Sequence, residues 1–544
     1  MPEGSAGEGD WLAADLVAAY VQSSGTGHVF AYPGDPIIGL MESARRRGLE
    51  VVLARREASA AFMAEAQGML TGTLGVCLST LGPGSSALVN GVAAATLDRS
   101  PVLAMSGQIE RSREQFFTHQ VLDHRLLYSP ITKWAGTLEP SSAPTILRKA
   151  IRTAQAERPG AVHLSCSSDV LGARVPGDVR LPPAAPAAGA LNVYAAGGMA
   201  SGPGEVLRRA SRPVILAGIG ATRAGSTAPL TELAETAGIP VVVSGMAKGV
   251  FPEDHPYFAG VLDMACNQLL WQFLADSDLI VCAGFDPVEL IKPWTVAAPV
   301  LHIDSVPNTD QIYFSECEVV GNIAVALEWL ASDWKGEARW SPAQVAGHRA
   351  RLRDSYYQGR VTGRLNPTDV IDTLRDLLPR DTVATCDVGS HKLLVGQGWT
   401  TYQPRAMLMT NGLSSMGFGV PAAIGARLVS GERLVVAVIG DGGFAMTATE
   451  LRLASSLGLG IVVVVLVDGS LNRIELKQAA LGYPATATRL ERMDVAAMAA
   501  ALDCDGARIE SAQDLASCLS GAARLTRPLV IEASVDPAQY QAQF

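Results

Sequence analysis

Apolar side chains in the first third of the chain repeat at two alternating spacings. Some stretches place them every three or four residues, which is typical of helices, and others hold short apolar runs, which are typical of strands. The stretch 80–95 begins with turn residues and continues in a helical pattern. Strands that alternate with helices predict a parallel sheet covered on both faces. The predicted helices cover 14–21 and 58–70, and the predicted strands start at His28, Val51 and Gly75.

The same alternation returns twice further along the chain. A second block starts at Arg212 and ends near Leu330, and a third starts near Val370. Residues 174–205 are rich in Pro, Gly and Ala, and residues 333–367 are polar and basic, so both are predicted to be linkers, the second partly helical. The pattern therefore predicts an α/β protein. Its three doubly wound parallel-sheet domains are expected at 11–173, 206–332 and 366–540.

Length and composition agree with this division. The chain has 544 residues, well beyond the ~100–200 residues of one domain. Apolar residues make up 48% and charged residues 18%, which is typical of a well-buried globular enzyme. The formal net charge is −10, whereas a surface that binds nucleic-acid phosphates must be basic. We therefore expect no nucleic-acid partner.

The sequence also bears on the compartment in which the protein works. No apolar run approaches the ~18–20 residues that span a bilayer, and the polar, acidic start is the opposite of a signal peptide. The eight cysteines form no CxxC pair and no Cys/His ligand spacing, a pattern typical of buried thiols in a reducing compartment. We expect a cytoplasmic protein that does not associate with membranes.

Two acidic residues in the third block directly follow buried strands. LVVAVIGDGG places Asp441 between glycines, and IVVVVLV is followed by Asp468. In an open α/β sheet, ligands bind beyond the carboxyl ends of the strands, where glycines let backbone N–H groups approach a phosphate. Two such carboxylates could share one Mg²⁺, which takes oxygen ligands together with phosphates. The alternative is that GDG is only a turn and that Asp468 is a solvated loop residue.

The spacing of these motifs resembles the signature of the thiamine-diphosphate enzymes, and the resemblance runs from about residue 11 to 540. It implies a pyrimidine-binding, a middle and a diphosphate-binding domain, with thiamine diphosphate and Mg²⁺ as cofactors. The metal ligands would be Asp441, Asp468 and the backbone carbonyl of Ser470. Val467 departs from the family, which usually has Asn just before the second ligand. This departure removes a polar side chain near the diphosphate.

Residues of the first block match the family's pyrimidine side. Glu57 lies at a strand-to-helix junction, where the resemblance places the catalytic Glu. Its carboxyl group would bond the aminopyrimidine ring and promote the imino tautomer that removes the C2 proton. The alternative is an acid favoured by the dipole at the start of a helix. Gly34 in AYPGD and Gly84 in TLGPGSS would line the same side, and both are predicted to lie in tight turns.

Segments of the third block match the rest of the cofactor site. Met416 in TNGLSSMGFG corresponds to the bulky apolar residue that wedges between the two cofactor rings and bends the cofactor. Ordinary core packing is the alternative for this side chain. The other residues that the resemblance assigns to cofactor binding are Gly389, Ser390, His391, Ser415, Gly440, Gly442 and Gly443.

A short motif, FFTHQ, matches positions that line the reaction cavity in acetolactate-synthase-like members. Gln120 would orient and protonate the reacting groups, and His119 would assist, although a plain surface histidine is the alternative. The paired adjacent histidines of pyruvate-decarboxylase-like members are missing. Glu475 lies one place beyond the position of the decarboxylases' catalytic Glu, so it is expected to be solvated.

The second block resembles catabolic acetolactate synthases and carboxyethylarginine synthase rather than the biosynthetic, FAD-containing synthases. Its stretch CAGFDPVELIKPW carries this resemblance, and its AGIG turn lacks a full dinucleotide fingerprint. We therefore expect no FAD. In the family the cofactor lies between the first domain of one subunit and the third domain of another, which implies a homodimer or homotetramer.

The resemblance implies a carboligase. Such an enzyme removes CO₂ from a 2-oxo acid, here pyruvate or a relative, and transfers the remaining acyl-anion equivalent to a second small-molecule carbonyl acceptor. Three alternatives stay open: a simple 2-oxo-acid decarboxylase, a secondary-metabolism transferase with an amine acceptor, and a non-catalytic relative that only binds the cofactor. The sequence alone names neither the donor nor the acceptor.

Overall fold

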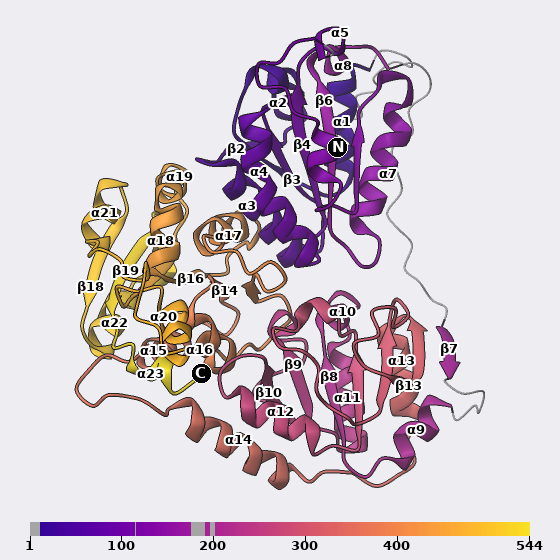
Figure 1. Cartoon of the computed structure of the whole chain (residues 1–544), viewed down its shortest axis with the longest axis vertical. Helices are drawn as coiled ribbons and strands as arrows, with labels where there is room; N and C mark the ends of the chain where they lie inside the picture. The colour runs from indigo at the N-terminus through magenta and orange to yellow at the C-terminus, as the bar shows by residue number, and fades with distance from the viewer. Residues whose placement is uncertain (1–10, 115, 176–190, 196–201, 544) are drawn as a thin grey trace. The chain divides into compact units, whose positions relative to one another are not determined.

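The computed structural model describes residues 11–114, 116–175, 191–195 and 202–543. These residues form two compact units. The first unit holds residues 11–175 together with Ile424–Val429, and the second holds residues 191–423 and 430–543. Figure 1 traces the path of the chain through both units.

The first unit is built on a six-stranded sheet. Its strands are β1 (His28–Ala31), β2 (Glu50–Leu53), β3 (Gly75–Ser79), β4 (Val102–Gln108), β5 (Trp134–Thr137) and β6 (Ala161–Ser167). They lie in the order β2-β1-β3-β4-β6-β5, and all neighbours are parallel. Strands β3, β4 and β6 are buried along their whole length, as expected of a parallel sheet with both faces covered.

Helices cover both faces of this first sheet. Figure 1 shows α1 (Ala13–Ser23) and α7 (Ala143–Gln155) on one side, and α3 (Glu57–Thr71) and α4 (Pro83–Leu97) on the other. Helix α3 begins at the strand-to-helix junction after β2 and ends at Gly72, whose φ of +74° allows the left-handed turn that closes it. The remaining helices are η1 (Asp35–Ile37), α2 (Ile38–Arg46), α5 (Arg111–Glu114), α6 (His124–Tyr128), η2 (Pro140–Ser142) and α8 (Ser168–Leu171).

The second unit contains two sheets, of which the first has seven strands. They are β7 (Leu191–Ala195), β8 (Pro213–Ala217), β9 (Val241–Ser244), β10 (Phe258–Leu262), β11 (Leu279–Ala283), β12 (Val300–Asp304) and β13 (Ser315–Gly321). Their order is β10-β9-β8-β11-β12-β13-β7, and only the edge strand β7 is antiparallel among these strands.

Strand β7 corrects one sequence prediction. It lies within 174–205, which was expected to be a linker throughout, yet its backbone pairs with β13 from Leu191 to Ala195. The rest of that stretch lies outside the described residues, except for 174–175 and for 202–205, which enter α9. The run LNVYA is short and is surrounded by Ala and Gly, so composition averaged over the stretch concealed it.

Helices flank the seven-stranded sheet and lead into the next one. They are α9 (Pro203–Arg209), α10 (Ile219–Arg223), α11 (Thr227–Ala237), η4 (Gly245–Ala247), α12 (Asn267–Ala275), η5 (Pro287–Glu289), α13 (Ile323–Asp333) and α14 (Pro342–Tyr356). Helix α14 lies in the predicted linker 333–367, which is therefore partly helical as expected. A capping box between Ser341 and Gln344 starts the helix, and Leu352 and Tyr356 are buried.

The other sheet of the second unit has six strands. They are β14 (Val383–Cys386), β15 (Met407–Met409), β16 (Val435–Gly440), β17 (Ile461–Val467), β18 (Asp505–Ile509) and β19 (Leu529–Ser534). The order is β15-β14-β16-β17-β19-β18, and every pair is parallel. Because β16 and β17 are neighbours, the residues that follow them meet at one edge of the sheet.

The helices of this last part include the four that contribute residues to the cavity described below, namely α16, α18, α20 and α23. The full set is α15 (Pro367–Leu377), α16 (Ser390–Gly398), α17 (Gly419–Val429), α18 (Asp441–Thr447), η6 (Ala448–Glu450), α19 (Leu451–Ser456), α20 (Asn472–Ala480), α21 (Val495–Ala501), α22 (Ala512–Leu519), η7 (Ala522–Arg524) and α23 (Ala538–Gln541).

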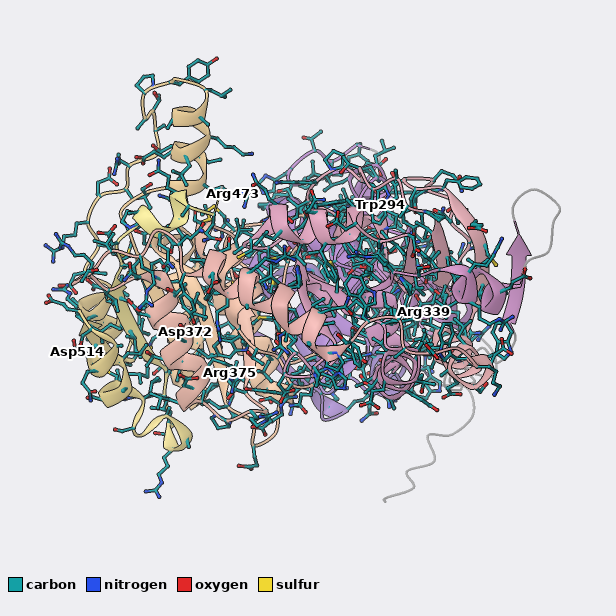
Figure 2. The ribbon with its side chains drawn as sticks, turned by 90° about the horizontal axis from the view of Figure 1, so that it is seen from below. Trp294, Arg339, Asp372, Arg375, Arg473 and Asp514 are labelled. Atoms are coloured by element: carbon teal, nitrogen blue, oxygen red, sulfur yellow. The ribbon has the colours of Figure 1, made fainter. Side chains whose placement is uncertain are left out.

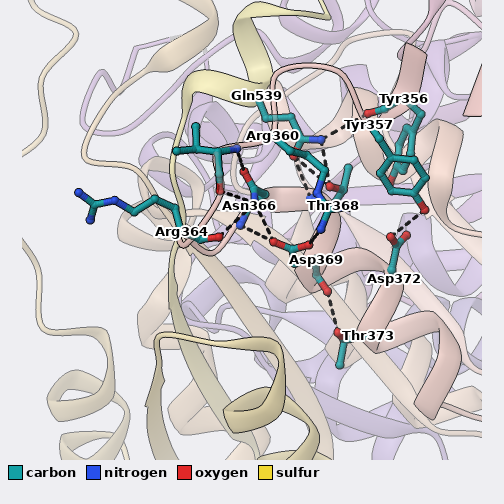
Figure 3. A network of polar contacts seen from close by, with 11 residues as sticks. Tyr356, Tyr357, Arg360, Arg364, Asn366, Thr368, Asp369, Asp372, Thr373 and Gln539 are labelled. Carbon is teal, nitrogen blue, oxygen red and sulfur yellow. Dashed lines mark hydrogen bonds and ion pairs between the residues drawn. The ribbon is translucent and has the colours of Figure 1, made fainter. Parts of the chain in front are cut away.

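A polar network fastens the start of α15 to the end of the chain (Figure 3). Asn366 and Asp369 form a capping box at the first turn of α15. The hydroxyl of Thr368 donates to Oε1 of Gln539 on α23 at 3.0 Å. Tyr357 donates to Asp372 at 2.9 Å. The first turn of α15 is therefore joined to the final helix.

The predicted fold class is confirmed: the chain is an α/β protein with three doubly wound sheets, and the one antiparallel edge strand among the described strands is the only departure from parallel pairing. Among the described residues, no helix is both long enough and apolar enough to cross a membrane.

Candidate active site

The carboxyl ends of β16 and β17 border a cavity of about 140 Å³. The two strands are paired from Val435 to Gly440, so residues that lie far apart in the sequence converge there. Ten of the predicted site residues line this cavity: Gly389, Ser390, His391, Met416, Gly440, Asp441, Gly442, Gly443, Asp468 and Ser470. Ser415 is not among the described residues that line it.

Asp441 and Asp468 are held by backbone N–H groups at the edge of the cavity. Asp441 is the first residue of α18, and its two carboxylate oxygens accept from the N–H groups of Gly442 and Gly469, both at 2.8 Å. The N–H of Ser470 donates to Asp468 at 3.0 Å. Burial raises the pKa of Asp441. Burial, together with the charge of Asp441, raises the pKa of Asp468 to about 7.

These two carboxyl groups fit a shared cation. Each resists ionisation because it is buried, and Asp468 also because of the charge of Asp441, so a bound cation would favour the charged form of both. No group of three or more His, Cys, Asp or Glu side chains that could hold a metal occurs in the described part of the chain. Mg²⁺ does not need one, since it is commonly bound by one or two carboxylates and completes its shell with waters and phosphate oxygens.

The turn Gly389-Ser390-His391 presents groups that suit a diphosphate. Ser390 and His391 begin α16, so their backbone lies at the positive end of that helix. Nε2 of His391 is buried and has no hydrogen-bond partner among the described residues. Burial lowers the pKa of His391 to about 4, so its ring is neutral near pH 7. A neutral imidazole can still donate a hydrogen bond to an anionic ligand.

Glycines keep this side of the cavity open. A Cβ atom on Gly389 or Gly440 would lie 2.7 Å or 3.2 Å from the ring of His391. A Cβ on Gly442 would lie 3.0 Å from Leu471 and 3.2 Å from Cε of Met416. The absence of side chains at these positions therefore leaves His391 and Met416 in place and lets a ligand approach the backbone.

Asp387 fixes the loop that carries Met416, a role that sequence reasoning missed. Its carboxylate is fully buried and accepts from the N–H groups of Gly417, at 3.0 and 3.1 Å, and of Gly419, at 3.1 Å. Val388 donates to the same carboxylate at 2.6 Å. Burial nevertheless raises the pKa of Asp387 to about 6. The sequence signal was available, because Asp387 directly precedes the diphosphate turn, but its partners lie 30 residues away.

The segment after Asp468 is fixed at several points. Leu471 donates to the carbonyl of Thr488 at 2.7 Å, and the hydroxyl of Ser390 donates to Oδ1 of Asn472 at 2.8 Å. Glu475 was expected to be solvated, but it is held instead. It accepts from the hydroxyl of Ser470 at 2.9 Å and pairs with Arg489 at 2.5 Å.

The first unit brings three of its predicted residues together around Thr80. A Cβ on Gly84 would lie 2.7 Å from Cγ2 of Thr80 and 3.1 Å from Oε1 of Glu57, and a Cβ on Gly34 would lie 2.2 Å from Oγ1 of Thr80. Glu57 is the first residue of α3 and is half-buried. At both positions a side chain would clash with Thr80, so glycine is required. Thr80 is a further residue of this cluster that the sequence did not single out.

His119 and Gln120 lie in an exposed stretch of the first unit. The backbone of Gln120 has a φ of +59°, and a Cβ on Gly82 would lie 2.5 Å from its carbonyl oxygen. The loop therefore packs against the turn that precedes α4. The catalytic roles assigned to these two residues stay predictions.

A buried polar network supports the Gly84 turn from behind. Tyr128 stacks on His163 with ring centroids 3.6 Å apart and donates from its hydroxyl to the carbonyl of Ser85 at 2.5 Å. Nε2 of His163 lies 2.9 Å from Oγ of Ser106. The turn beside Glu57 is therefore braced by side chains that no sequence motif identified.

Family comparisons agree with this arrangement. Three thiamine pyrophosphate enzyme models match the chain in order. The N-terminal TPP binding domain matches residues 12–127, the central domain matches 204–330, and the C-terminal TPP binding domain matches 387–533. The N-terminal match contains Glu57, and the C-terminal match contains Asp441 and Asp468.

Full-length relatives carry related names. The catabolic acetolactate synthase of Raoultella terrigena is 30% identical over 96% of this chain and 95% of its own length. An acetolactate synthase of Bacillus subtilis is 29% identical over 96% of this chain and 93% of its own, and acetolactate synthase isozyme 3 large subunit of Escherichia coli is 29% identical over 97% and 95%. This chain therefore belongs to the thiamine pyrophosphate enzymes, in their acetolactate-synthase-like branch.

Proposed function

We propose that this enzyme is a carboligase that uses thiamine diphosphate and Mg²⁺. It removes CO₂ from a 2-oxo acid, pyruvate or a close relative, and joins the remaining acyl unit to a second carbonyl compound. The observation that carries the proposal is the cavity in which Asp441 and Asp468 face a glycine-lined turn and the unpartnered Nε2 of His391. The names of the relatives supply the reaction class.

The residues of the second unit would bind and orient the cofactor. Asp441, Asp468 and the carbonyl of Ser470 would hold the metal, and Ser390 and His391 would donate to the diphosphate. Met416 would hold the two cofactor rings in a bent conformation. When bound, thiamine diphosphate supplies a nucleophilic carbon and an electron sink for decarboxylation.

Glu57 would control the proton of the aminopyrimidine ring. Its carboxyl group would share a proton with the ring nitrogen, and the close approach of Gly84 limits the positions that this carboxyl group can adopt. Gln120 and His119 would orient the substrate and supply a proton. In the overall reaction one carbon–carbon bond of the donor breaks, CO₂ leaves, a new carbon–carbon bond forms, and the acceptor oxygen takes up one proton.

Further assignments belong to the same proposal. The domains are 11–173, 206–332 and 366–540. The active form is a homodimer or homotetramer, in which Glu57 of one subunit and the metal ligands of another would serve one cofactor. The eight cysteines are free thiols, which supports a reducing compartment such as the cytoplasm.

We also propose that the middle domain works without FAD. After β8, the N–H of Ile219 donates to both oxygens of the buried Glu289 at 3.0 Å, and the N–H of Asp286 donates to the same carboxyl group at 2.8 Å. A carboxyl group of the protein itself thus occupies the turn where a dinucleotide phosphate would approach. This contact supports the expectation drawn from the sequence.

The test is incubation with thiamine diphosphate, Mg²⁺ and a panel of 2-oxo acids, with products identified by mass spectrometry. A hydroxy ketone or acetohydroxy acid supports the carboligase, whereas the aldehyde alone would contradict it in favour of a decarboxylase. Glu57→Gln should lower turnover at least a hundredfold, and the exposed Glu337→Gln serves as the matched control. Full turnover by Glu57→Gln would contradict the proton-transfer role.

A further inference from the structure

Lys392 is a buried lysine to which the proposed function assigns no role. It lies in the first turn of α16, directly after His391, and only 4% of it is exposed. Its Nζ donates to the carbonyl of Thr410 at 2.7 Å and to Oδ1 of Asn411 at 2.9 Å. Burying an ammonium group is costly unless its hydrogen bonds are made, so these contacts constrain where Thr410 and Asn411 lie.

Asn411 is fixed at both ends of its side-chain amide. Its Oδ1 accepts from Lys392, and its Nδ2 donates to the backbone carbonyl of Glu289 at 2.9 Å. The backbone carbonyl of Asn411 accepts from the hydroxyl of Ser414 at 2.8 Å. The φ of Ser414 is +53°, a left-handed conformation that residues with a side chain rarely adopt. Lys392 therefore holds the start of a tight loop that leads to Met416.

Asp387 holds the far end of this loop. Its carboxylate accepts from the backbone N–H groups of Gly417 and Gly419. Asp387 precedes the diphosphate turn in the sequence, and Lys392 follows it. The short segment 387–392 thus carries the diphosphate turn together with two charged side chains that hold the loop on which Met416 lies.

The charge of Lys392 also suits the groups around it. Burial raises the pKa of Asp387 to about 6, and the charge of Lys392 opposes this rise, which favours the carboxylate that accepts from the loop. Burial and the charge of Lys392 both lower the pKa of His391, to about 4, so the imidazole of the turn stays neutral. A neutral side chain at position 392 would provide neither effect.

We propose that Lys392 is a positioning residue that joins the diphosphate turn and the Met416 loop into one rigid piece. This inference rests on the proposed cofactor site and refines it. The turn and Met416 both line the cavity, so a ligand whose diphosphate binds at the turn meets the Met416 side chain in a set place. Lys392 is not among the described residues that line the cavity, and it acts through the loop rather than on the ligand.

Calorimetric titrations with two ligands in the presence of Mg²⁺ test this role. Inorganic pyrophosphate needs only the turn and the metal ligands, whereas thiamine diphosphate also needs Met416. In Lys392→Met, binding of thiamine diphosphate should weaken about tenfold, while binding of pyrophosphate stays within about twofold of wild type. Lys335→Met removes an exposed lysine and, as the control, should leave both affinities unchanged. Equal weakening for both ligands would overturn the proposal and assign Lys392 to the diphosphate, and no weakening for either would also overturn it.

A double-mutant cycle tests whether Lys392 acts through Met416. Met416→Ala should weaken binding of thiamine diphosphate about tenfold, and the double variant should lose about the same factor rather than about a hundredfold. Fully additive losses would overturn the proposal, because a lysine that only stabilises the fold acts independently of Met416. Where Lys392→Met does not fold, Lys392→Gln, which keeps a neutral donor, takes its place in both tests. If wild type binds neither ligand, the proposed cofactor site itself fails, and this result differs from binding that ignores Lys392.

Discussion

Asp387 offers a direct test of how the Met416 loop is held. Asp387→Ala removes the acceptor for three backbone N–H groups, those of Val388, Gly417 and Gly419. The carboxylate is fully buried, so the abandoned N–H groups of the loop have no immediate access to water. The loop that presents Met416 to the cavity should therefore loosen.

Two opposing effects set the magnitude. A buried N–H group without an acceptor costs ~1–3 kcal/mol, so three of them cost roughly 6 kcal/mol. Removing the carboxylate also relieves a penalty, because burial raises the pKa of Asp387 from 3.8 to about 6, and ~1.4 kcal/mol per pKa unit makes that relief about 3 kcal/mol. The net loss is about 3 kcal/mol, which corresponds to a fall in Tm of roughly 6–12 °C for a domain of this size.

The assay is thermal unfolding of Asp387→Ala followed by circular dichroism, together with a titration with thiamine diphosphate. Asp387→Asn keeps one acceptor oxygen and should fall between the variant and wild type. The exposed Asp354→Ala is the control and should unfold with wild type. If Asp387→Ala matched wild type in both unfolding and cofactor affinity, the carboxylate would not be what holds the loop.

Three further variants test other parts of the account. Burial raises the pKa of Glu289 to about 8, so the folded protein keeps a proton that the unfolded chain releases near pH 4.5, and wild-type stability falls as pH rises between these values. Urea unfolding should find Glu289→Gln equal to wild type near pH 4.5 and more stable by on the order of 4 kcal/mol at pH 8; equal pH profiles would refute this. Gly84→Ala would bring a Cβ within 3.1 Å of the Glu57 carboxylate and 2.7 Å of Cγ2 of Thr80, so it should lower kcat about tenfold and also lower Tm, and unchanged kcat would contradict the crowding. Tyr128→Phe removes the hydrogen bond to Ser85 and should cost ~1 kcal/mol of unfolding free energy in a denaturant titration, a loss that would be absent if the contact were incidental.

Much of the fold was predictable because buried parallel strands leave unbroken apolar runs. The runs that became β16 and β17 are examples, since both are buried and their ends carry Asp441 and Asp468. Two short strands of the third block were not predicted, because they lack such a run. Strand β15 spans only Met407–Met409, and β18, at the edge of its sheet, alternates half-buried and exposed positions and has only Ile509 buried. Neither leaves an apolar run that stands out from its surroundings.

Most of the predicted site residues of the second unit were singled out because they lie beside a glycine or at a strand end. The residues that support them were not, because their contacts span long distances in the sequence. Asp387 binds amides 30 residues away, and Tyr128 braces Ser85 across 43 residues.

The central claim is that thiamine diphosphate is held through Mg²⁺ at Asp441 and Asp468, and calorimetry tests it most directly. Purified protein is titrated with thiamine diphosphate in the presence of Mg²⁺ and again in the presence of EDTA, with Asp441→Asn compared against the exposed Asp514→Ala (Figure 2). We expect binding that requires Mg²⁺, that weakens at least a hundredfold in Asp441→Asn and that is unchanged in Asp514→Ala. Equal binding with EDTA, or in Asp441→Asn, would contradict the claim.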